Sequence, residues 1–484
     1  MAVVKQTGRS FLKKALVLAT ALVLLAGTGT FDGRADSAAT TKKPAPAPQK
    51  IVRYTGQKSK AISMVYTTRR ELALTFNGLG DEKKMKQLLD DLDKYQIKAT
   101  FFLPGNKLAK QPAIAKTILA RGHEIESNTM NQQDLTKLPY EKVYTEIKAG
   151  NELIKQKAGI TPRYVRTTLA TYNDDVRLGA AHNGMQAVIG YSLFLHNWEK
   201  ETPEQKNRYI RKYINRGGII ALDIEENRDL PGTIPLIAKA AADVGYKFVT
   251  LQKLIEQGGE RKPLEAIEGY NAAVISPNYS DATYKLMYRK ETDKKEVAIT
   301  IDDWGSDYTV TKILDILAKE GVKATFFLRA DGTEKNPNLA RAMVEAGHDV
   351  GNHTYSHPIG TTIPAAQLQE EIVKAHRIIT EAIQQKPAMI FRPPAGAYDE
   401  STLKAIGATG YHTIAMFDVI PSDHDRSKTA EEIVKTVVDK TQNGSLILLH
   451  MLDDTHTIEA LPVLIKQLRS KGYTFVKMSE MVAE

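Results

Sequence analysis

Short apolar runs alternate with longer amphipathic stretches along most of the chain. In the C-terminal part, runs rich in β-branched and aromatic residues predict strands at 296–301, 323–328 and 445–450. Apolar residues at helical spacing predict helices at 311–321, 338–347, 366–383 and 429–444. Gly321 and Gly347 stand at the expected ends of two of these helices, and Thr429 with Glu432 predicts a capping box. Strands that alternate with helices in this way are typical of an α/β fold with a parallel sheet.

The pattern occurs twice. Segment 84–105 (KMKQLLDDLDKYQIKATFFLPG) matches segment 310–330 (VTKILDILAKEGVKATFFLRA), and ARGHEIESN matches EAGHDVGNH. Asn77 and Asp302 close equivalent apolar runs and stand 225 positions apart. The other matching pairs are separated by 225 to 227 positions. The chain of 484 residues is therefore predicted to hold two copies of one domain. Polar clusters at the carboxyl ends of successive strands favour a barrel over an open doubly wound sheet.

The two copies are expected at 61–257 and 291–484, and the remaining segments have simpler predictions. Residues 1–39 combine a basic start, an apolar run and small residues, the layout of a secretory signal. An uncleaved membrane anchor over residues 11–31 is the alternative, and in both cases the rest of the chain is expected to be exported. The Pro-rich stretch 40–60 predicts an extended linker, and 258–290 predicts a second linker with a small strand near Tyr284 to Tyr288.

Candidate chemistry gathers at the ends of the strands in the second copy. Asp302 and Asp303 close the first strand, where adjacent side chains point in different directions. His353 and His357 are four residues apart in NHTYSHP, a spacing that can direct two imidazoles at one ion. Cysteine is absent, so any metal must be held by His, Asp or Glu. Together with Asp303, the two histidines predict a catalytic metal site with two imidazoles, one carboxylate and open positions.

Two further clusters follow later strands. In FRPPAGAYD, Arg392 can keep a carboxylate ionised, and the rigid loop up to Ala395 can direct a backbone N–H at a developing oxyanion. In LILLHM, His450 ends a strand where a general acid could stand, and Asp423 in IPSDHD could orient its imidazole. Taken singly, the first cluster could be an ordinary proline turn and the second a core histidine.

These residues and their order carry a resemblance. The second copy resembles the polysaccharide deacetylases with a NodB-homology domain, a carbohydrate esterase family of distorted (β/α) barrels that remove acetyl groups from N-acetylated sugars. All five family motifs occur in order, TFDDG as TIDDWG, HSxxH as HTYSH, RPPYG as RPPAG, the aspartate-tryptophan pair as Asp423 and His424, and LxH as Leu448 to His450. The resemblance implies an α/β fold of two tandem distorted barrels, the first of them degenerate.

The resemblance also implies a role for each residue. Asp302 is the implied general base and Arg392 its tether, while His450 is the implied general acid, tuned by Asp423. The backbone N–H of Ala395 is expected in the oxyanion hole. The implied ligands of a divalent metal, with zinc expected first and cobalt, nickel or iron as alternatives, are Asp303, His353 and His357.

The second copy departs from the family pattern at three positions. Trp304 replaces a glycine beside the expected metal ligand, Ala395 replaces an aromatic residue, and His424 replaces a tryptophan. These changes affect the pocket that would hold a sugar ring more than the implied reaction. In the first copy only Arg166 survives, because the expected base, metal ligands and acid are replaced by Asn77, Gly78, Asn128, Gln132 and Asp223. That copy is expected neither to bind metal nor to catalyse, and to act as scaffold, spacer or glycan-binding module.

The sequence therefore predicts an exported, metal-dependent hydrolase, monomeric, that removes N-acetyl groups from amino-sugar polymers at the cell wall. Peptidoglycan is the expected substrate and partner, with chitin-type oligomers as an alternative. A non-catalytic wall-glycan-binding protein and an O-acetyl polysaccharide esterase are the competing functions. The net charge of +9 suits an anionic cell envelope, and the absence of a Lys/Arg stripe interleaved with aromatics argues against a nucleic-acid partner.

Overall fold

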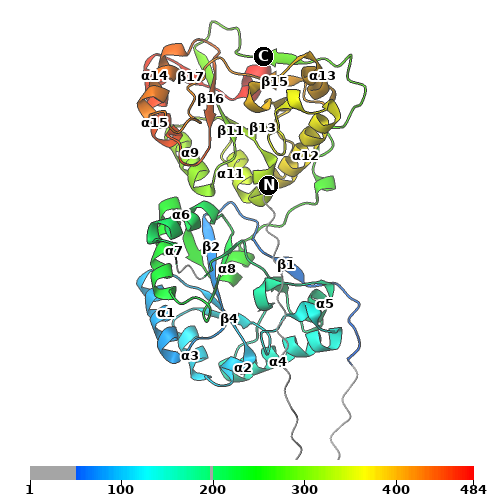
Figure 1. Cartoon of the computed structure of the whole chain (residues 1–484), viewed down its shortest axis with the longest axis vertical. Helices are drawn as coiled ribbons and strands as arrows, with labels where there is room; N and C mark the ends of the chain where they lie inside the picture. The colour runs from blue at the N-terminus through cyan, green and yellow to red at the C-terminus, as the bar shows by residue number, and fades with distance from the viewer. Residues whose placement is uncertain (1–50, 197–199, 484) are drawn as a thin grey trace, which may run out of the picture. The chain divides into compact units, whose positions relative to one another are not determined.

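The computed structural model describes residues 51–196 and 200–483. The expected signal, the alternative anchor and most of the Pro-rich linker lie outside the described residues. Within the described part, no helix is both long enough and apolar enough to span a membrane. Two parallel sheets with their helices follow one another along the chain (Figure 1).

The first sheet has nine strands in the order β1-β6-β5-β4-β3-β2-β8-β7, and β9 pairs with β2 beside this path. Every pairing between its named strands is parallel. The strands are β1 (Lys60–Ile62), β2 (Glu71–Asn77), β3 (Thr100–Leu103), β4 (Glu124–Ser127), β5 (Tyr164–Val165), β6 (Ala187–Ile189), β7 (Leu193–Phe194), β8 (Ile219–Asp223) and β9 (Lys247–Val249).

The second sheet repeats this plan in the order β10-β15-β14-β13-β12-β11-β16, with β17 paired to β11. Its strands are β10 (Lys285–Met287), β11 (Glu296–Asp303), β12 (Thr325–Leu328), β13 (Asp349–Asn352), β14 (Ile390–Phe391), β15 (Thr413–Ala415), β16 (Leu446–His450) and β17 (Thr474–Phe475). The predicted fold class is confirmed, as two tandem α/β domains of distorted barrel type. The barrels are distorted in that neither strand path closes on itself.

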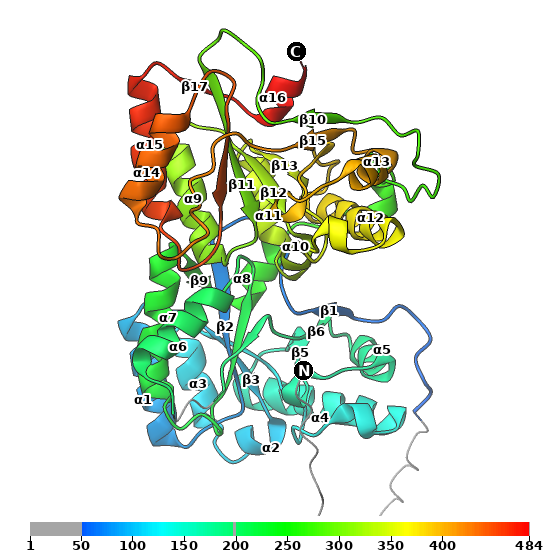
Figure 2. The ribbon, with the colours of Figure 1, turned by 45° about the horizontal axis from the view of Figure 1, so that its top comes forward.

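Helices cover each sheet in the same order (Figure 2). Those of the first domain are α1 (Glu82–Lys94), α2 (Gly105–Leu108), α3 (Ala113–Ala120), α4 (Tyr140–Ala158), α5 (Asp174–His182), α6 (Pro203–Tyr213), α7 (Leu230–Val244) and α8 (Leu251–Glu256). Those of the second are α9 (Asp307–Lys319), α10 (Ala330–Lys335), α11 (Pro337–Glu345), α12 (Ala365–Ile383), α13 (Glu400–Ala408), α14 (Ala430–Lys440), α15 (Thr457–Ser470) and α16 (Met478–Ala483). Short 3₁₀ turns lie at Leu135–Lys137, Thr168–Ala170, Leu264–Ala266, Gly360–Thr362 and Pro394–Gly396.

Local sequence signals explain where the helices of the second domain begin and end. The capping box at the start of α14 is present, since Thr429 and Glu432 exchange hydrogen bonds between side chain and backbone. Gly321 and Gly347 follow α9 and α11 in the left-handed region, with φ of 63° and 85°. The apolar faces of these helices pack on β11 and β12, where Ile299, Ile313 and Ile433 are among the fully buried residues. Central strands buried on both faces account for their continuous apolar runs.

The stretch expected to link the copies contributes to the second sheet. β10 lies within it and pairs with β15, just as β1 pairs with β6 in the first domain. The carbonyl of Gly269 contacts Nε2 of His376 on α12 at 2.8 Å, and Ala273 is buried. The second sheet with its covering chain therefore extends N-terminal of residue 291.

The two domains also share a polar, largely buried interface. The guanidinium of Arg216, before β8, forms an ion pair of 3.4 Å with Asp307 at the start of α9, and both side chains are buried. Asn338 donates to the carbonyls of Val65 and Arg216 at 2.9 and 2.7 Å and accepts from the Thr67 N–H. Since Asp307 lies just beyond the carboxyl end of β11, the first domain contacts the second on the side where the polar clusters were expected.

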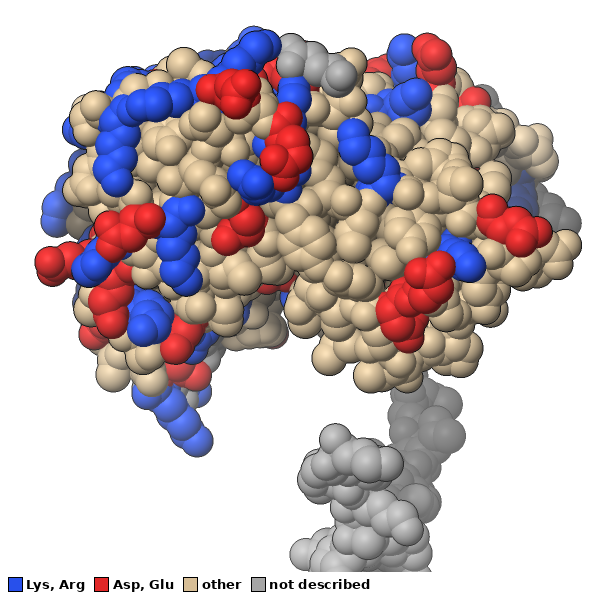
Figure 3. Space-filling model, turned by 90° about the horizontal axis from the view of Figure 1, so that it is seen from above, with Lys and Arg blue, Asp and Glu red and all other residues tan. Residues whose placement is uncertain are grey.

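On the face of the molecule shown in Figure 3, basic side chains are interspersed with acidic ones and with larger neutral areas. No continuous basic stripe of described residues crosses this face.

Candidate active site

The predicted residues of the second domain lie at one edge of its sheet. Asp302 and His450 are directly opposite each other where β11 pairs with β16, and His353 follows the end of β13. Arg392 follows β14 and reaches back to Asp302. Because parallel strands end at the same edge, residues up to 148 positions apart in the sequence converge there.

Three side chains could hold a metal ion. One ligand atom from each of Asp303, His353 and His357 lies within 4.8 Å of the others. Nε2 of His357 is 3.4 Å from Oδ1 of Asp303, and the two imidazole rings have centroids 4.9 Å apart. Two neutral imidazoles and one carboxylate form a donor set that suits zinc or another divalent transition metal. The residues present therefore fit a metal ion.

His353 is oriented as a ligand by its second nitrogen. Its Nδ1–H donates to the carbonyl of Arg392 at 2.7 Å, which leaves Nε2 directed at the candidate metal position. Burial lowers the pKa of His353 to about 3, so its imidazole is neutral at physiological pH. A neutral imidazole with one nitrogen already bonded is the form that coordinates metal.

The backbone at the candidate ligands adopts left-handed conformations that non-glycine residues rarely take. φ is 77° at Asp303, 67° at Thr354 and 66° at His357. Thr354 supports the turn, because its hydroxyl accepts a 3.0 Å hydrogen bond from the His357 N–H. Such strained positions persist only where surrounding contacts impose them, and they concentrate at functional sites.

Asp302 is buried and paired with Arg392. Nη1 of Arg392 donates to Oδ1 of Asp302 at 2.7 Å and to the hydroxyl of Thr300 at 2.7 Å, and the guanidinium stacks over Phe327. Burial raises the pKa of Asp302, and the charges of Arg392 and His450 oppose that rise. A buried carboxylate held ionised by a guanidinium but destabilised by desolvation is suited to accept a proton.

His450 is held by Asp423. Nδ1 of His450 lies 2.8 Å from Oδ1 of Asp423, and Oδ2 accepts hydrogen bonds from the His450 N–H and the Thr457 hydroxyl, both at 2.7 Å. Burial alone would lower the pKa of His450, but the hydrogen bond and charge of Asp423, together with the charges of Asp302 and Asp303, outweigh burial and raise it. The imidazolium is therefore favoured, as a proton donor requires.

Ala395 lies three residues beyond Arg392, in the turn Pro394–Gly396. Its φ is 55°, and its backbone N–H donates to no acceptor among the described residues. Ala395 itself is exposed, so this N–H can reach a ligand. Among the described residues, no hydrogen bond or ion pair joins Ala395 to the other seven predicted residues. Those seven are connected to one another through direct contacts or strand pairing.

Two supporting residues, Glu371 and Thr300, were not among the residues predicted from the sequence. Glu371 on α12 accepts from the N–H groups of Tyr355 and Ser356 at 3.0 and 2.7 Å and so holds the loop between the two histidines. Thr300 binds Arg392, as described above. Both have counterparts in the first domain, since Glu146 accepts from the Asn131 N–H at 3.0 Å and Thr75 accepts from Arg166 at 2.8 Å. Identity between the copies at positions without catalytic chemistry was the signal that would have found them.

At the equivalent strand ends, the first domain carries different polar side chains. Lys107 donates to the Gln132 side chain at 3.0 Å and forms an ion pair with Glu225, which also accepts from the Leu79 N–H. Gln132 stands at the position of His357. The ammonium group of Lys107 therefore lies beside a position that corresponds to a candidate metal ligand of the second domain. Asp303 is replaced by Gly78, whose added Cβ would lie 3.1 Å from Glu225.

The chain belongs to the polysaccharide deacetylase family. The family model described as polysaccharide deacetylase matches two segments, residues 65–188 and 289–414, one in each domain. The two segments agree with the duplication predicted from the sequence. Membership implies hydrolytic deacetylase chemistry at the level of the family.

Two deacetylases and one solved structure are similar to part of this chain. A peptidoglycan-N-acetylglucosamine deacetylase of Bacillus cereus is 35% identical over 202 residues, 41% of this chain and 72% of that protein. The peptidoglycan-N-acetylmuramic acid deacetylase PdaA of Bacillus subtilis is 29% identical over 205 residues, 42% of this chain and 76% of that protein. Among solved structures, a CE4 family pseudoenzyme from Bacillus anthracis is 31% identical, with TM-score 0.39, covering 42% of this chain and 70% of that one.

Proposed function

We propose that the protein is a metal-dependent deacetylase that hydrolyses the N-acetyl groups of amino-sugar polymers, with peptidoglycan as its substrate. The observation that carries the proposal is the complete constellation in the second domain. The pairs Asp302–Arg392 and His450–Asp423 and the candidate ligands all meet at one sheet edge. The names of the relatives support peptidoglycan, and a wall substrate would place the folded domains outside the cell membrane.

The metal site has one role in this reaction. Asp303, His353 and His357 would hold a divalent ion, with zinc the best match to the donors, and such an ion supplies Lewis-acid polarisation of a carbonyl and a lowered pKa of water. The two histidines are positioned by other parts of the chain, His353 through the Arg392 carbonyl and His357 through Thr354 and Glu371.

The remaining groups move protons and stabilise charge. Asp302 removes a proton from the water that attacks the acetyl carbonyl carbon, and Arg392 keeps the carboxylate ionised before that step. The N–H of Ala395 donates to the carbonyl oxygen as it gains negative charge. His450 protonates the amide nitrogen as the carbon–nitrogen bond breaks, because an unprotonated amine is a poor leaving group. The products are acetate and a glucosamine unit, and Asp423 stabilises the imidazolium before the transfer.

The domain roles follow from the same reasoning. We place catalysis in the second domain and propose that the first, which holds the Lys107–Glu225 ion pair at its equivalent site, does not turn over substrate.

The test is release of acetate from purified peptidoglycan, N-acetylglucosamine oligomers and an O-acetylated polysaccharide, each with and without a chelator. The proposal expects release from the first two that is abolished by the chelator and restored by zinc. Release from the O-acetylated polymer alone would identify an esterase. Binding to peptidoglycan without release from any substrate would identify a glycan-binding protein.

A further inference from the structure

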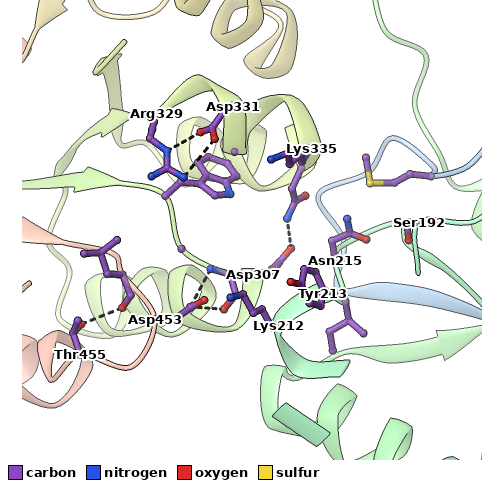
Figure 4. A pocket seen from close by; sticks show the side chains of 18 of the residues that line it. Ser192, Lys212, Tyr213, Asn215, Asp307, Arg329, Asp331, Lys335, Asp453 and Thr455 are labelled. Atoms are coloured by element: carbon purple, nitrogen blue, oxygen red, sulfur yellow. Dashed lines mark hydrogen bonds and ion pairs between the residues drawn. The ribbon is translucent and has the colours of Figure 1, made fainter. Parts of the chain in front are cut away.

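A cleft of about 860 Å³ lies between the two domains and is lined by both. Its volume is within the range of ligand-binding pockets, about 300 to 1,000 Å³. Figure 4 shows Lys212, Tyr213 and Asn215 of the first domain on the side opposite Arg329, Asp331 and Lys335 of the second. The buried Arg216–Asp307 and Asn338 contacts that join the domains lie next to it, so both walls are firmly connected.

The cleft borders the candidate active site at two points. Trp304, in its lining, directly follows the candidate ligand Asp303. His424, also in the lining, has its ring centroid 5.0 Å from that of His450. These are two of the positions at which the chain departs from the pattern of its family. A polymer whose reacting sugar lies at Asp302 and His450 would therefore extend into this cleft.

The charge in the cleft is unbalanced in favour of cations. Lys212, Lys335 and Arg426 form no ion pair with any acid among the described residues. Of the acids in the lining, Asp331 is paired with Arg329 at 2.7 Å and Asp307 with Arg216. Asp453 accepts hydrogen bonds from the hydroxyls of Ser306 and Thr309 at 2.7 and 2.6 Å. Carboxylates on a ligand would complement the free cations.

The lining also offers groups that suit a sugar. The amide oxygen of Asn336 is buried and has no hydrogen-bond partner, while its nitrogen donates to Asp307 at 3.1 Å. Asn215 has a second buried amide oxygen without a partner. Both side chains line the cleft and have unused acceptor capacity, but neither oxygen is itself exposed. Tyr213, 47% exposed, and Trp304 add aromatic surface, which small-molecule sites combine with a few polar groups.

We infer that this cleft binds the glycan units next to the reacting sugar and selects a carboxylate-bearing glycan, with the first domain supplying one wall. The inference rests on the proposed function for its ligand class. It gives the first domain a role in binding through Lys212, Tyr213 and Asn215, at the opposite end of its strands from the degenerate site.

The test separates binding from turnover. Full-length protein carrying Asp302→Asn is sedimented with insoluble peptidoglycan, which bears carboxylates, and with chitin, which does not. Adding Lys212→Glu is expected to weaken binding to peptidoglycan about ten-fold and to weaken binding to chitin much less. Lys212→Arg should keep the affinity. Lys116→Glu, an equally exposed charge reversal on α3 away from the cleft, is the matched control and should leave binding unchanged.

A parallel arm uses the catalytically intact protein. Lys212→Glu and Tyr213→Ala should each raise KM for peptidoglycan several-fold, with the thermal midpoint unchanged. Unchanged affinity and KM in Lys212→Glu, or equal losses on peptidoglycan and chitin, would overturn the inference even if acetate is released. Weakened sedimentation in a protein that releases no acetate from any substrate would support the cleft while refuting the proposed deacetylase.

Discussion

The two domains have similar backbone conformations in equivalent loops but carry different side chains there. The left-handed positions of the second domain at Thr354, His357 and Ala395 recur in the first at Thr129, Gln132 and Leu169, with φ of 63°, 55° and 55°. The same loop conformations therefore occur with and without the candidate metal ligands. This strained geometry is therefore supported by the surrounding fold, through Glu146 and Glu371 in equivalent places, and does not require the candidate metal ligands.

The buried arginines show the same contrast in electrostatics. Arg392 has the carboxylate of Asp302 as its partner, whereas Arg166 donates to the Asn77 amide at 3.1 Å, the Thr75 hydroxyl and backbone carbonyls. Burial lowers the pKa of Arg166 to about 9, because no carboxylate compensates for lost hydration. Of these two buried arginines, only Arg392 is paired with a carboxylate among the described residues.

Removing a candidate ligand should have the largest effect on this comparison. His357→Ala is expected to reduce bound metal from about one equivalent per chain to none and acetate release to background, since two ligands hold the ion poorly. The matched variant Gln132→Ala in the first domain should change neither quantity. Elemental analysis after zinc dialysis measures both, and two equivalents in the unaltered protein would contradict a single metal site per chain.

Removing the proposed base should be the next largest change. Asp302→Asn is expected to lower kcat about 10²- to 10⁴-fold, because the amide cannot accept a proton, while zinc content stays near one equivalent. Steady-state assays with elemental analysis test this. The reverse exchange in the first domain, Asn77→Asp, should create no activity in a His357→Ala background. Loss of metal in Asp302→Asn would mean that this carboxylate is itself a ligand.

Breaking the contact between the domains should cost stability. Arg216→Ala leaves Asp307 buried without its partner and is expected to lower the free energy of unfolding by about 3 to 5 kcal/mol. Denaturant unfolding followed by circular dichroism measures the change. Lys86→Ala, which alters an exposed side chain on α1, is a control that should have no measurable effect. An unchanged unfolding midpoint in Arg216→Ala would show that the domains are energetically independent.

A buried acid in the first domain should make its stability depend on pH. Burial raises the pKa of Glu126 from its ordinary 4.5 to about 8, although its carboxyl accepts from the Arg163 and Tyr164 N–H groups. Since the folded state retains a proton that the unfolded state releases, the contribution of Glu126 to stability should be most favourable below pH 4.5 and become less favourable as pH rises towards 8. Glu126→Gln is expected to remove this slope and to stabilise the protein at pH 8 by roughly 3 kcal/mol.

Unfolding curves of Glu126→Gln and the unaltered protein at pH 5 and pH 8 provide the measurement. The second domain has Gly351 at the equivalent position and lacks this acid. Parallel stability profiles for the two proteins would contradict the assignment of the slope to Glu126.

The smallest expected effect is a change in the pH profile. Asp423→Asn removes the charge that raises the pKa of His450, so the imidazolium should be lost at lower pH. The alkaline limb of kcat/KM should therefore move to lower pH, and activity at pH 8 should fall roughly ten-fold, more than at pH 6. A uniform loss at all pH values would indicate that Asp423 acts only by holding His450 in place.

The sequence by itself determined the duplication, the α/β alternation and the strand ends that carry the polar clusters. These features depend on local periodicity, on glycine and capping signals, and on short motifs whose members are few residues apart, such as His353 and His357. For the same reason Asp302, Asp303 and His450 could be placed at the ends of strands before the structure was known.

The tertiary structure decided which distant groups meet. The ion pair of Lys107 with Glu225 joins residues 118 positions apart, and Arg216 with Asp307 joins residues of different domains. The register of β11 against β16 places Asp302 opposite His450, and the packing of the domains forms the cleft beside Trp304 and His424. Such contacts depend on how whole elements pack and exclude water, and no local pattern of residues specifies them.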